Sequence, residues 1–534
     1  MAGGEETGTR TAWMDVAAPS YAPLGEDTAA DVCIVGAGIA GMTTAYSLAA
    51  EGRSVVVLDD GPVGGGMTQR TTAHLSNAID DRYLRIERLH GREGARLAAE
   101  SHTAAIDRIE AIVRDERIDC DFERLDGYLV AAPGTPADFL GRELAAAQRA
   151  GLADVTASTR APSGAFEAGG GCLRFPQQGQ LHPGKYLAGL ARTLERLGGR
   201  IFCGTHAATV EGGAAAKVTT AEGRTVSAAA VVVATNTPIN DVVTIHTKQA
   251  PYSTYVVAAR VPRGSVAKAL YWDTADPYHY VRLRDDGEQE LLIVGGEDHK
   301  SGQADDGAKR FERLEQWLRE RFPTAGAVTL RWSGQVMEPV DGIAFIGRNP
   351  GGPSNVYVAT GDSGMGMTHG TIAGMLLTEL IVGRNAPWAQ LYDPARKMLR
   401  APIEYAKENL NVAAQYFEDY LTRGDVESAD ELAPGQGAVL RRGLTKIAAY
   451  RDYDGLLHEH SAACPHLGCI VQFDDVEKTW NCPCHGSRFD RYGRVIVGPA
   501  NRDLAPSARA ERAPRPPLNV HAGRAADRDH AGSE

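Results

Sequence analysis

The chain has 534 residues, of which 43% are hydrophobic and 23% charged, and its formal net charge is −12. This length allows two or three domains, and the acidic balance argues against nucleic acid or an anionic membrane surface as the partner. No stretch approaches the ~20 consecutive apolar residues of a spanning helix, and residues 1–30 read as a polar leader without the regions of a signal peptide. We therefore expect a cytoplasmic protein without a membrane span.

The first motif runs from Asp31 to Gly61 and reads as an apolar strand, a glycine-rich turn, a helix and a second strand. The turn has the spacing G-x-G-x-x-G, formed by Gly36, Gly38 and Gly41. In this context the glycines permit the tight turn, let a pyrophosphate approach the backbone and let the helix pack on the strand. Asp59, about 20 residues further on, is placed to accept a hydrogen bond from a ribose hydroxyl. The pattern predicts a dinucleotide cofactor.

The next segments alternate between loop, helix and strand patterns. Residues 64–76 are loop-like, with glycines and hydroxyls suited to holding a cofactor. Residues 181–202 read as a helix followed by a strand, and residues 228–236 as a buried strand that runs into a loop. From about residue 251 to 332, β-like runs surround a helix predicted over 308–321. These segments predict further parts of an α/β domain and a β-rich region.

A second glycine-rich segment, residues 361–383, follows the strand-like sequence NVYVAT. The order of strand, glycine turn and long helix gives a helix N-terminus that can point at a cofactor. The alternative is a helix that packs on a strand through small residues and binds nothing. The upstream G-x-G-x-x-G motif, the dinucleotide-binding fingerprint, favours the cofactor interpretation.

Helical sequence continues to about residue 422, and the acidic segment 423–437 has the composition of a linker. Two short cysteine- and histidine-containing motifs follow, with the combined spacing C-x-H-x15-C-x2-H. The four residues are Cys464, His466, Cys482 and His485. Two thiolates and two imidazoles fit a 2Fe–2S cluster in which histidines replace cysteines on one iron. Residues 508–534 are biased toward Pro, Arg and Ala, and we expect them to be disordered.

Zinc is the alternative ligand for two cysteines and two histidines. Zinc fingers, however, usually pair cysteine with cysteine and histidine with histidine in each short motif. Here each motif supplies one cysteine and one histidine. Two loops that bind opposite ends of a two-iron cluster need this arrangement. The pattern favours the iron–sulfur cluster.

These motifs resemble those of two families. The D-amino-acid oxidase superfamily of FAD-dependent oxidoreductases has segments similar to the G-x-G-x-x-G fingerprint, LHPGKYLAGLARTL, VVVATN and GDSGMGMTHGTIAGMLL. The Rieske family has motifs that resemble CPHLGC and CPCHGS. They imply an α/β FAD-binding Rossmann-like domain with an interleaved β-rich substrate domain, plus a small all-β Rieske domain. The implied ranges are 31–422 for the flavin region (FAD-binding parts 31–105, 172–248 and 338–400; substrate domain 106–171 and 249–337) and 438–507 for the Rieske domain. The Rieske resemblance also implies a disulfide between Cys469 and Cys484.

The flavin resemblance assigns FAD contacts residue by residue. The pyrophosphate turn would comprise Gly36, Ala37, Gly38, Ile39, Ala40 and Gly41, and Asp59 and Asp60 would meet the adenosine ribose. Further contacts would come from Gly66, Thr68, Thr71, Ala207, Ala234 and Thr235. The segment near the flavin ring would comprise Gly361, Gly364, Met365, Gly366, Met367 and Thr368.

Substrate contacts in this superfamily come from the β-rich domain, which implies candidates in Tyr255, Tyr280 and Arg282, the last suited to a substrate carboxylate. His369 is a candidate near the flavin pyrimidine edge. The alternatives are an amphipathic strand with half-buried tyrosines and a capping or packing histidine.

Three other polar residues have weaker cases. Some relatives attach flavin covalently to a histidine, but the sequence around His74 does not match their motif. Glu338 and Asp341 are expected to shape a turn rather than to act as an acid/base pair.

The two cofactors together predict a FAD-dependent dehydrogenase that oxidises a small substrate, an amine or an amino acid. Electrons would then leave singly through the Rieske cluster to an external acceptor, a protein or a quinone. The alternatives are an NAD(P)H-dependent reductase that feeds a partner oxygenase, and a non-catalytic redox relay. Phe489 stands where high-potential Rieske proteins carry a hydrogen-bonding tyrosine, so we expect an intermediate cluster potential.

Overall fold

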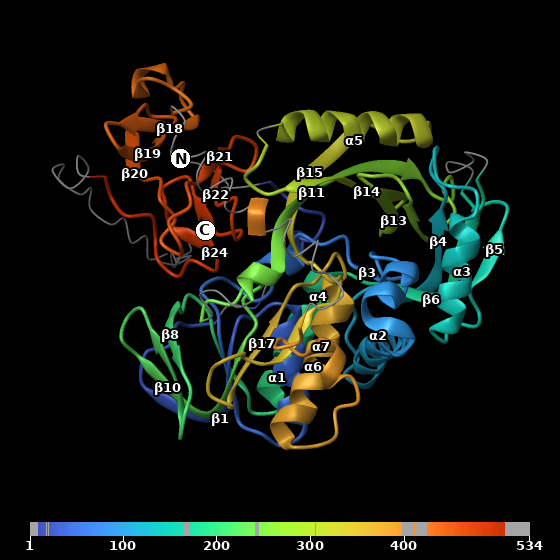
Figure 1. Cartoon of the computed structure of the whole chain (residues 1–534), viewed down its shortest axis with the longest axis horizontal. Helices are drawn as coiled ribbons and strands as arrows, with labels where there is room; N and C mark the ends of the chain where they lie inside the picture. The colour runs from blue at the N-terminus through green and yellow to red at the C-terminus, as the bar shows by residue number, and fades with distance from the viewer. Residues whose placement is uncertain are drawn as a thin grey trace, which may run out of the picture.

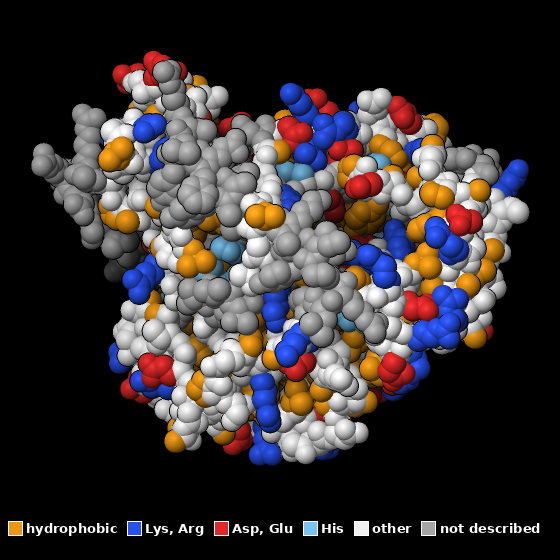
Figure 2. Space-filling view, in the orientation of Figure 1, with side chains coloured by type: hydrophobic (Ala, Val, Ile, Leu, Met, Phe, Trp, Pro, Cys, Tyr) orange, Lys and Arg blue, Asp and Glu red, His pale blue; other side chains and the backbone are white. Residues whose placement is uncertain are grey.

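The computed structural model describes residues 9–17, 19, 21–163, 170–240, 245–304, 306–397, 409–411 and 424–507. It places two large sheets side by side, with a small β domain from the C-terminal part of the chain against them (Figure 1). Basic and acidic side chains are interspersed over the face seen in Figure 2. No helix in the described ranges is long and apolar enough to cross a membrane. The expected disordered tail, 508–534, lies outside the described residues.

The first sheet has the strand order β16-β17-β10-β1-β2-β7, and β9 joins it through β10 and carries β8. Its strands are β1 (Thr28–Val35), β2 (Val55–Leu58), β7 (Arg200–Phe202), β8 (Ala207–Glu211), β9 (Ala216–Thr220), β10 (Thr225–Val233), β16 (Phe345–Arg348) and β17 (Val356–Thr360). Strands β7, β2, β1, β10 and β17 run parallel. Strand β2 and the last four residues of β1 are buried, as expected for parallel strands covered on both faces.

Two helices pack closely against each other on this sheet: α1 (Ile39–Ala50) and α6 (Gly366–Val382). Glycine makes the close approach possible. A Cβ atom added at Gly370 would lie 2.6 Å from a methyl of Ile39, and one added at Gly374 would lie 2.5 Å from a methyl of Thr43. The small residues of the second glycine-rich segment therefore serve packing between two helices, whereas the alternative raised from the sequence was a helix packed on a strand without a ligand.

The second sheet has the order β15-β11-β14-β13-β12-β4-β6-β3, with β5 paired to β6. Its strands are β3 (His74–Leu75), β4 (Glu123–Val130), β5 (Thr156–Ser158), β6 (Cys172–Gln180), β11 (Gln249–Pro262), β12 (Leu270–Asp273), β13 (His279–Asp286), β14 (Gln289–Lys300) and β15 (Val328–Pro339). The sequence boundary at residue 172 differs from the structure, because β6 pairs with β4 and so belongs to this sheet. The chain returns to the first sheet only afterwards.

The remaining helices cover the two sheets. They are α2 (Tyr83–Asp115), α3 (Phe139–Arg149), α4 (Pro183–Arg196), α5 (Gly307–Arg321) and α7 (Ala389–Tyr392), with short 3-10 turns at Met67–Gln69, His246–Lys248 and Ala429–Glu431. Helix α5 lies along the outer side of β11 and β14 (Figure 1) and buries Phe311, Leu314 and Leu318. It begins and ends within one residue of the helix predicted there.

The C-terminal domain has two antiparallel sheets. They comprise β18 (Gly437–Arg442), β19 (Thr445–Arg451) and β20 (Leu457–Ser461), and β21 (Gln472–Asp474), β22 (Thr479–Asn481), β23 (Arg488–Asp490) and β24 (Val495–Val497). The two cysteine- and histidine-containing motifs form the β20–β21 loop and the β22–β23 loop. The segment expected to be a linker, 423–437, is instead part of this domain where it is described, because Val426 bridges Leu440 and Asp425 bonds to Val439.

Candidate functional site

A cavity of about 910 Å³ lies between the first sheet, the second sheet and the C-terminal domain. One end is formed by the fingerprint turn and the ends of β1 and β2. The middle is formed by the residues before α6 and by β15, and the far wall by side chains of β12, β13 and β14. Its volume is at the upper end of the range for ligand pockets, which suits a large dinucleotide.

The fingerprint turn has the geometry that a pyrophosphate needs. A Cβ atom at Gly36 would lie 2.4 Å from the carbonyl oxygen of Ala234, and one at Gly41 would lie 1.8 Å from the carbonyl oxygen of Gly36. Larger side chains are therefore excluded from the turn. The carboxylate of Asp59 accepts hydrogen bonds from the backbone amides of Ala37 (2.6 Å) and Gly61 (2.7 Å), and burial raises its pKa to about 6. Asp59 thus also braces the turn itself.

Most of the residues predicted to contact FAD line this one cavity. They are Gly36, Gly38, Ile39, Ala40, Asp59, Asp60, Gly66, Thr68, Thr71, Ala207, Ala234, Thr235, Gly361, Gly364, Met365, Gly366 and Met367. The other three, Ala37, Gly41 and Thr368, are buried outside the lining. Segments that are up to about three hundred residues apart in the sequence therefore form one binding surface, and their chemistry fits FAD.

The turn before α6 approaches the cavity closely. Gly364 has a φ of +69°, and a Cβ atom there would lie 2.1 Å from a carboxylate oxygen of Asp80. His369, in the first turn of α6, lines the cavity and makes hydrogen bonds through both ring nitrogens, to the Asp362 carbonyl (2.8 Å) and to His102 (3.2 Å). Burial lowers the pKa of His369 to about 4, so the ring is neutral at pH 7.

The part of the cavity next to Gly364 is lined by four buried or half-buried carboxyl groups: Asp80, Asp298, Glu338 and Asp362. Burial raises the pKa of Asp298 to about 7, of Glu338 to about 8 and of Asp362 to about 6. The charge of Asp80 raises all three further, and its own pKa is also raised by burial. Carboxyl groups that share a site in this way disfavour each other's ionised form.

Two tyrosines of the second sheet complete this acidic wall. Tyr278 donates a hydrogen bond to Asp80 (2.7 Å), and the Tyr280 hydroxyl lies 2.7 Å from that of Thr254. Of the residues of the acidic wall, the sequence singled out Tyr280 and Glu338. Asp80, Asp298 and Tyr278 were missed because they come from three distant segments, and nothing in their local sequence marks them.

Glu338 and Asp341 have separate roles. Glu338 lines the cavity and accepts a hydrogen bond from Ser363 (2.9 Å), so the expectation that it only shapes a turn was incomplete. Asp341 lies outside the lining, where it pairs with Arg396 at 2.7 Å.

The structure does not bring two of the predicted substrate residues to the cavity. Tyr255 is 3% exposed and packs against Phe311, with 4.9 Å between ring centroids. Arg282 is 2% exposed, and its Nη1 donates hydrogen bonds to three backbone carbonyls at 2.9, 3.0 and 3.1 Å. Because Arg282 is buried on these carbonyls and does not line the cavity, the expected pairing of Arg282 with a substrate carboxylate does not fit the structure. Arg282 braces the second sheet instead.

His74 does line the cavity, but both of its ring nitrogens have partners. Nδ1 lies 3.0 Å from the hydroxyl of Thr72, and Nε2 lies 3.3 Å from the carbonyl oxygen of Val281. This arrangement gives no support to covalent attachment of flavin at His74.

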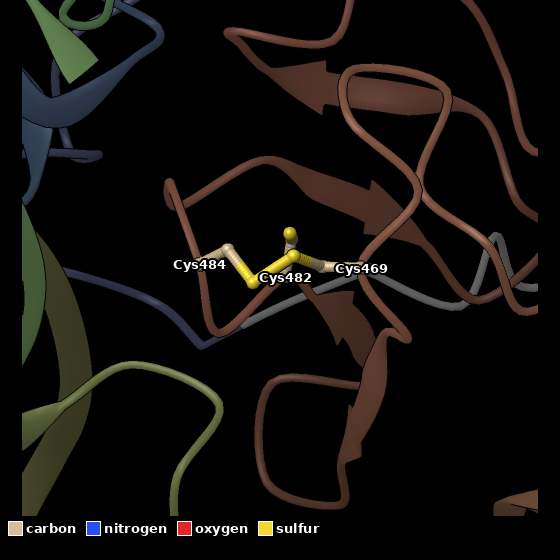
Figure 3. Close-up of side chains that lie close together, drawn as sticks. All are labelled: Cys469, Cys482 and Cys484. Carbon is tan, nitrogen blue, oxygen red and sulfur yellow. A yellow bond between two sulfur atoms is a disulfide. The ribbon is translucent and has the colours of Figure 1, made fainter. Parts of the chain in front are cut away.

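The cysteine- and histidine-containing loops come together in the C-terminal domain. Cys469 and Cys484 form a disulfide, as the Rieske resemblance implied, and Cys482 lies beside it (Figure 3). Cys464 and Cys482 are buried and within hydrogen-bonding reach of each other. The rings of His466 and His485 lie 5.0 Å apart, and Nδ1 of His485 is buried without a hydrogen-bond partner among the described residues. A pair of thiols and a pair of imidazoles, each pair formed between these two loops, fits a 2Fe–2S cluster.

The C-terminal domain docks directly on the flavin-binding part. Glu477 pairs with Arg70 at 3.1 Å and accepts a hydrogen bond from the Ser333 hydroxyl at 2.8 Å. In the cluster loop, the carbonyl oxygen of Gly486 accepts a hydrogen bond from the side chain of Gln335 (2.9 Å). Because Gln335 lines the cavity, the cluster loop lies directly behind the cavity wall.

Comparisons with known proteins agree with this geometry. The model of the family "FAD dependent oxidoreductase" matches residues 31–380, and that of the "Rieske [2Fe-2S] domain" matches residues 422–508. The Rieske 2Fe-2S iron-sulfur protein YhfW of Bacillus subtilis (strain 168) is 32% identical over 488 residues, which cover 91% of this chain and 95% of that protein. Gamma-glutamylputrescine oxidoreductase of Escherichia coli (strain K12) is 29% identical over 70% of this chain and 89% of its own length.

The crystal structure of glycine oxidase from Geobacillus kaustophilus has the same fold over 69% of this chain and 99% of that one, with a TM-score of 0.58 and 18% identity. The family matches and the geometry of the cavity and the two loops lead to the same conclusion. The chain belongs to the FAD-dependent oxidoreductases of the D-amino-acid oxidase type and carries a Rieske 2Fe-2S domain at its C-terminal side.

Proposed function

We propose that this protein is a FAD-dependent dehydrogenase that oxidises a small amine and passes the electrons one at a time through its Rieske cluster to an external acceptor. The observation that carries the proposal is the position of the cluster loop. Gly486 is hydrogen-bonded to Gln335, a residue of the flavin cavity wall. A cluster held this close to the flavin site would be superfluous in an oxidase that reduces oxygen directly.

The carboxyl groups of the cavity favour a cationic amine over an amino acid, because a bound cation would stabilise their ionised forms. The acidic wall carries Asp80, Asp298 and Glu338, while the arginines that line the cavity within the described residues are Arg70, Arg494 and Arg502. Arg70 is paired with Glu477, and the other two belong to the C-terminal domain at the opposite end. A substrate carboxylate would therefore find carboxyl groups rather than a guanidinium. The Escherichia coli relative named for gamma-glutamylputrescine is consistent with an amine substrate.

The side chains of the acidic wall supply binding, orientation and proton transfer. FAD, when bound, supplies the acceptor for a hydride from the carbon next to the amine nitrogen. An amine must lose its ammonium proton before that transfer, and Asp298, with a pKa of about 7, is suited to take it up at neutral pH. Glu338 and the Tyr278–Asp80 pair would hold the remaining polar groups of the substrate. Cys464, His466, Cys482 and His485 would hold the cluster.

Anaerobic titration tests the proposal. Cationic amines, zwitterionic amino acids and NADH are added separately to the purified protein, while the flavin and cluster spectra are followed together. We expect amines alone to bleach the flavin and then reduce the cluster. Bleaching by NADH would favour a reductase, and bleaching by none of the three would favour a redox relay.

A matched pair of variants tests the substrate contact. Asp298→Asn removes a titratable carboxyl group from the acidic wall, whereas Glu312→Gln changes an exposed acid on α5. We expect Asp298→Asn to lower kcat/KM for the amine by at least ~10-fold, typical of losing a proton acceptor or a buried charge partner. Glu312→Gln should leave it unchanged. Equal values for the two variants would contradict the assignment.

A further inference from the structure

One wall of the flavin cavity comes from the C-terminal domain. Residues 494–498 and 500–503, which comprise β24 and the loop after it, line the cavity at the same end as Asp59, Asp60 and Ala207. In the FAD-binding fold those three residues are expected at the adenosine half of the cofactor. The Rieske domain therefore lines the cavity through this segment, and its cluster loop contacts the cavity wall from behind at Gln335.

The segment is fixed to the flavin-binding part by direct hydrogen bonds. The side-chain amide of Asn501 donates to the carbonyl oxygen of Ala208 (3.0 Å), and the carbonyl oxygen of Asn501 lies 3.0 Å from Nε2 of His206. Nδ1 of the same histidine lies 3.4 Å from the carboxylate of Asp60. A continuous chain of contacts thus leads from the acid at the end of β2, through His206, to the Rieske domain.

The side chains of this segment have the chemistry of an adenosine diphosphate site. Ile496 lines the cavity yet is 46% exposed, so it offers an apolar surface on which a base can lie. Arg494 and Arg502 also line the cavity; within the described residues neither side chain forms a hydrogen bond, and the charge of Arg494 acts on Asp490. Guanidinium groups bind phosphate oxygens well, because their donors match that geometry.

We propose that the Rieske domain forms part of the FAD-binding site, with β24 and the loop to Asp503 closing over the adenosine half of the cofactor. Ile496 would contact the adenine, and Arg494 and Arg502 would attract the anionic pyrophosphate. FAD retention then depends on a docked Rieske domain, so the two cofactors are coupled in assembly. This inference rests on FAD binding alone and is independent of the amine substrate.

Equilibrium binding of FAD to the full-length apoflavoprotein, followed by quenching of flavin fluorescence, tests the proposal. Ile496→Ala is compared with Leu444→Ala, which removes an exposed leucine (92% exposed) from the β18–β19 turn of the same domain, outside the cavity lining. We expect Ile496→Ala to weaken FAD binding about fivefold to tenfold, as partial loss of a buried aliphatic contact does, and Leu444→Ala to leave it unchanged. The Rieske electron paramagnetic resonance signal should be equal in both variants and so shows that the domain is intact.

Two further measurements decide the position of the segment. The double variant Arg494→Ala/Arg502→Ala should weaken FAD binding at low salt, with a smaller difference at high salt because the attraction is screened. Photolysis of bound 8-azido-FAD should label residues 494–503, as identified by peptide mass mapping. The proposal is overturned if all three substitutions leave the FAD dissociation constant within twofold of the wild-type value, or if the label is confined to the flavin-binding part while the cluster signal is intact.

Discussion

The imidazole ring of His246 lies edge-on against that of His466, with 4.9 Å between the ring centroids. The same ring lies 5.8 Å from that of His485. His246 belongs to the flavin-binding part of the chain, in the turn just before β11, and is 2% exposed. The two histidines that we assign to the cluster therefore both contact the flavin-binding part, and this is the side on which electrons from the flavin would arrive.

Replacing His246 by alanine should raise the reduction potential of the cluster. The substitution opens a space next to both histidine ligands, which water can enter. Solvent stabilises the reduced cluster more than the oxidised one because reduction adds a negative charge, and the potential of such clusters depends on their exposure. Redox titration followed by electron paramagnetic resonance measures the change. His246→Phe keeps a ring in this place and should shift the potential less than His246→Ala, so equal shifts for the two variants would contradict this account.

Phe489→Tyr should raise the cluster potential as well, for a different reason. Phe489 is fully buried in the same apolar cluster as Cys464 and Cys482. A hydroxyl at this position would add a hydrogen-bond donor near the cluster sulfurs, and such donors stabilise the reduced state. The opposite change, Ser487→Ala, removes a hydroxyl that hydrogen-bonds the Cys464 side chain and should lower the potential. If both variants moved the potential in the same direction, the hydrogen-bond explanation would fail.

Glu338 makes the stability of the FAD-free protein depend on pH. Burial, together with the charges of Asp80 and Asp362, raises its pKa from 4.5 to about 8 in the folded protein. Between these two values the folded protein holds a proton that the unfolded chain has lost, so stability is full below about pH 4.5 and falls as the pH rises toward 8. One such group makes the free energy of unfolding fall by up to ~1.4 kcal/mol per pH unit.

Glu338→Gln removes this proton uptake, so urea unfolding between pH 5 and pH 8 should show a weaker loss of stability than in the wild type. Glu312→Gln, at an exposed position on α5, is the matched control and should keep the wild-type slope. An unchanged slope in Glu338→Gln would mean that its carboxyl is ionised in the folded protein at neutral pH.

Local patterns in the sequence predicted both cofactor sites. The spacing of the fingerprint glycines and of the cluster cysteines and histidines reflects backbone geometry within a few residues, which one segment can encode. The long glycine-to-helix segment before α6 was also predicted, and Gly364 does approach the cavity. Helix α5 was recognised because an amphipathic period over fifteen residues depends only on the segment itself.

The substrate side could not be predicted in the same way. Asp80 and Asp298 meet only because β14 and the segment before α2 converge on the cavity. The prediction for Arg282 was wrong for a similar reason. The alternation of residues along a strand shows which side chains share a face of the sheet, but it does not show which backbone carbonyls of other segments lie opposite that face. The docking of residues 494–503 on the flavin cavity depends on how two domains sit together, which no local pattern encodes.

The disulfide between Cys469 and Cys484 should account for much of the stability of the Rieske domain. It joins the two loops that carry the cluster residues across a sequence separation of 15. Closing a loop of this length restricts the unfolded chain by roughly 3 kcal/mol. We expect Cys469→Ala/Cys484→Ala to lower the free energy of unfolding of this domain by about 2–4 kcal/mol and to lower the 2Fe–2S content of the purified protein. The control is Cys203→Ala, which removes a buried free thiol from the flavin-binding part. It should leave the cluster content unchanged, and a double variant with full cluster content and wild-type stability would show that the bridge is dispensable.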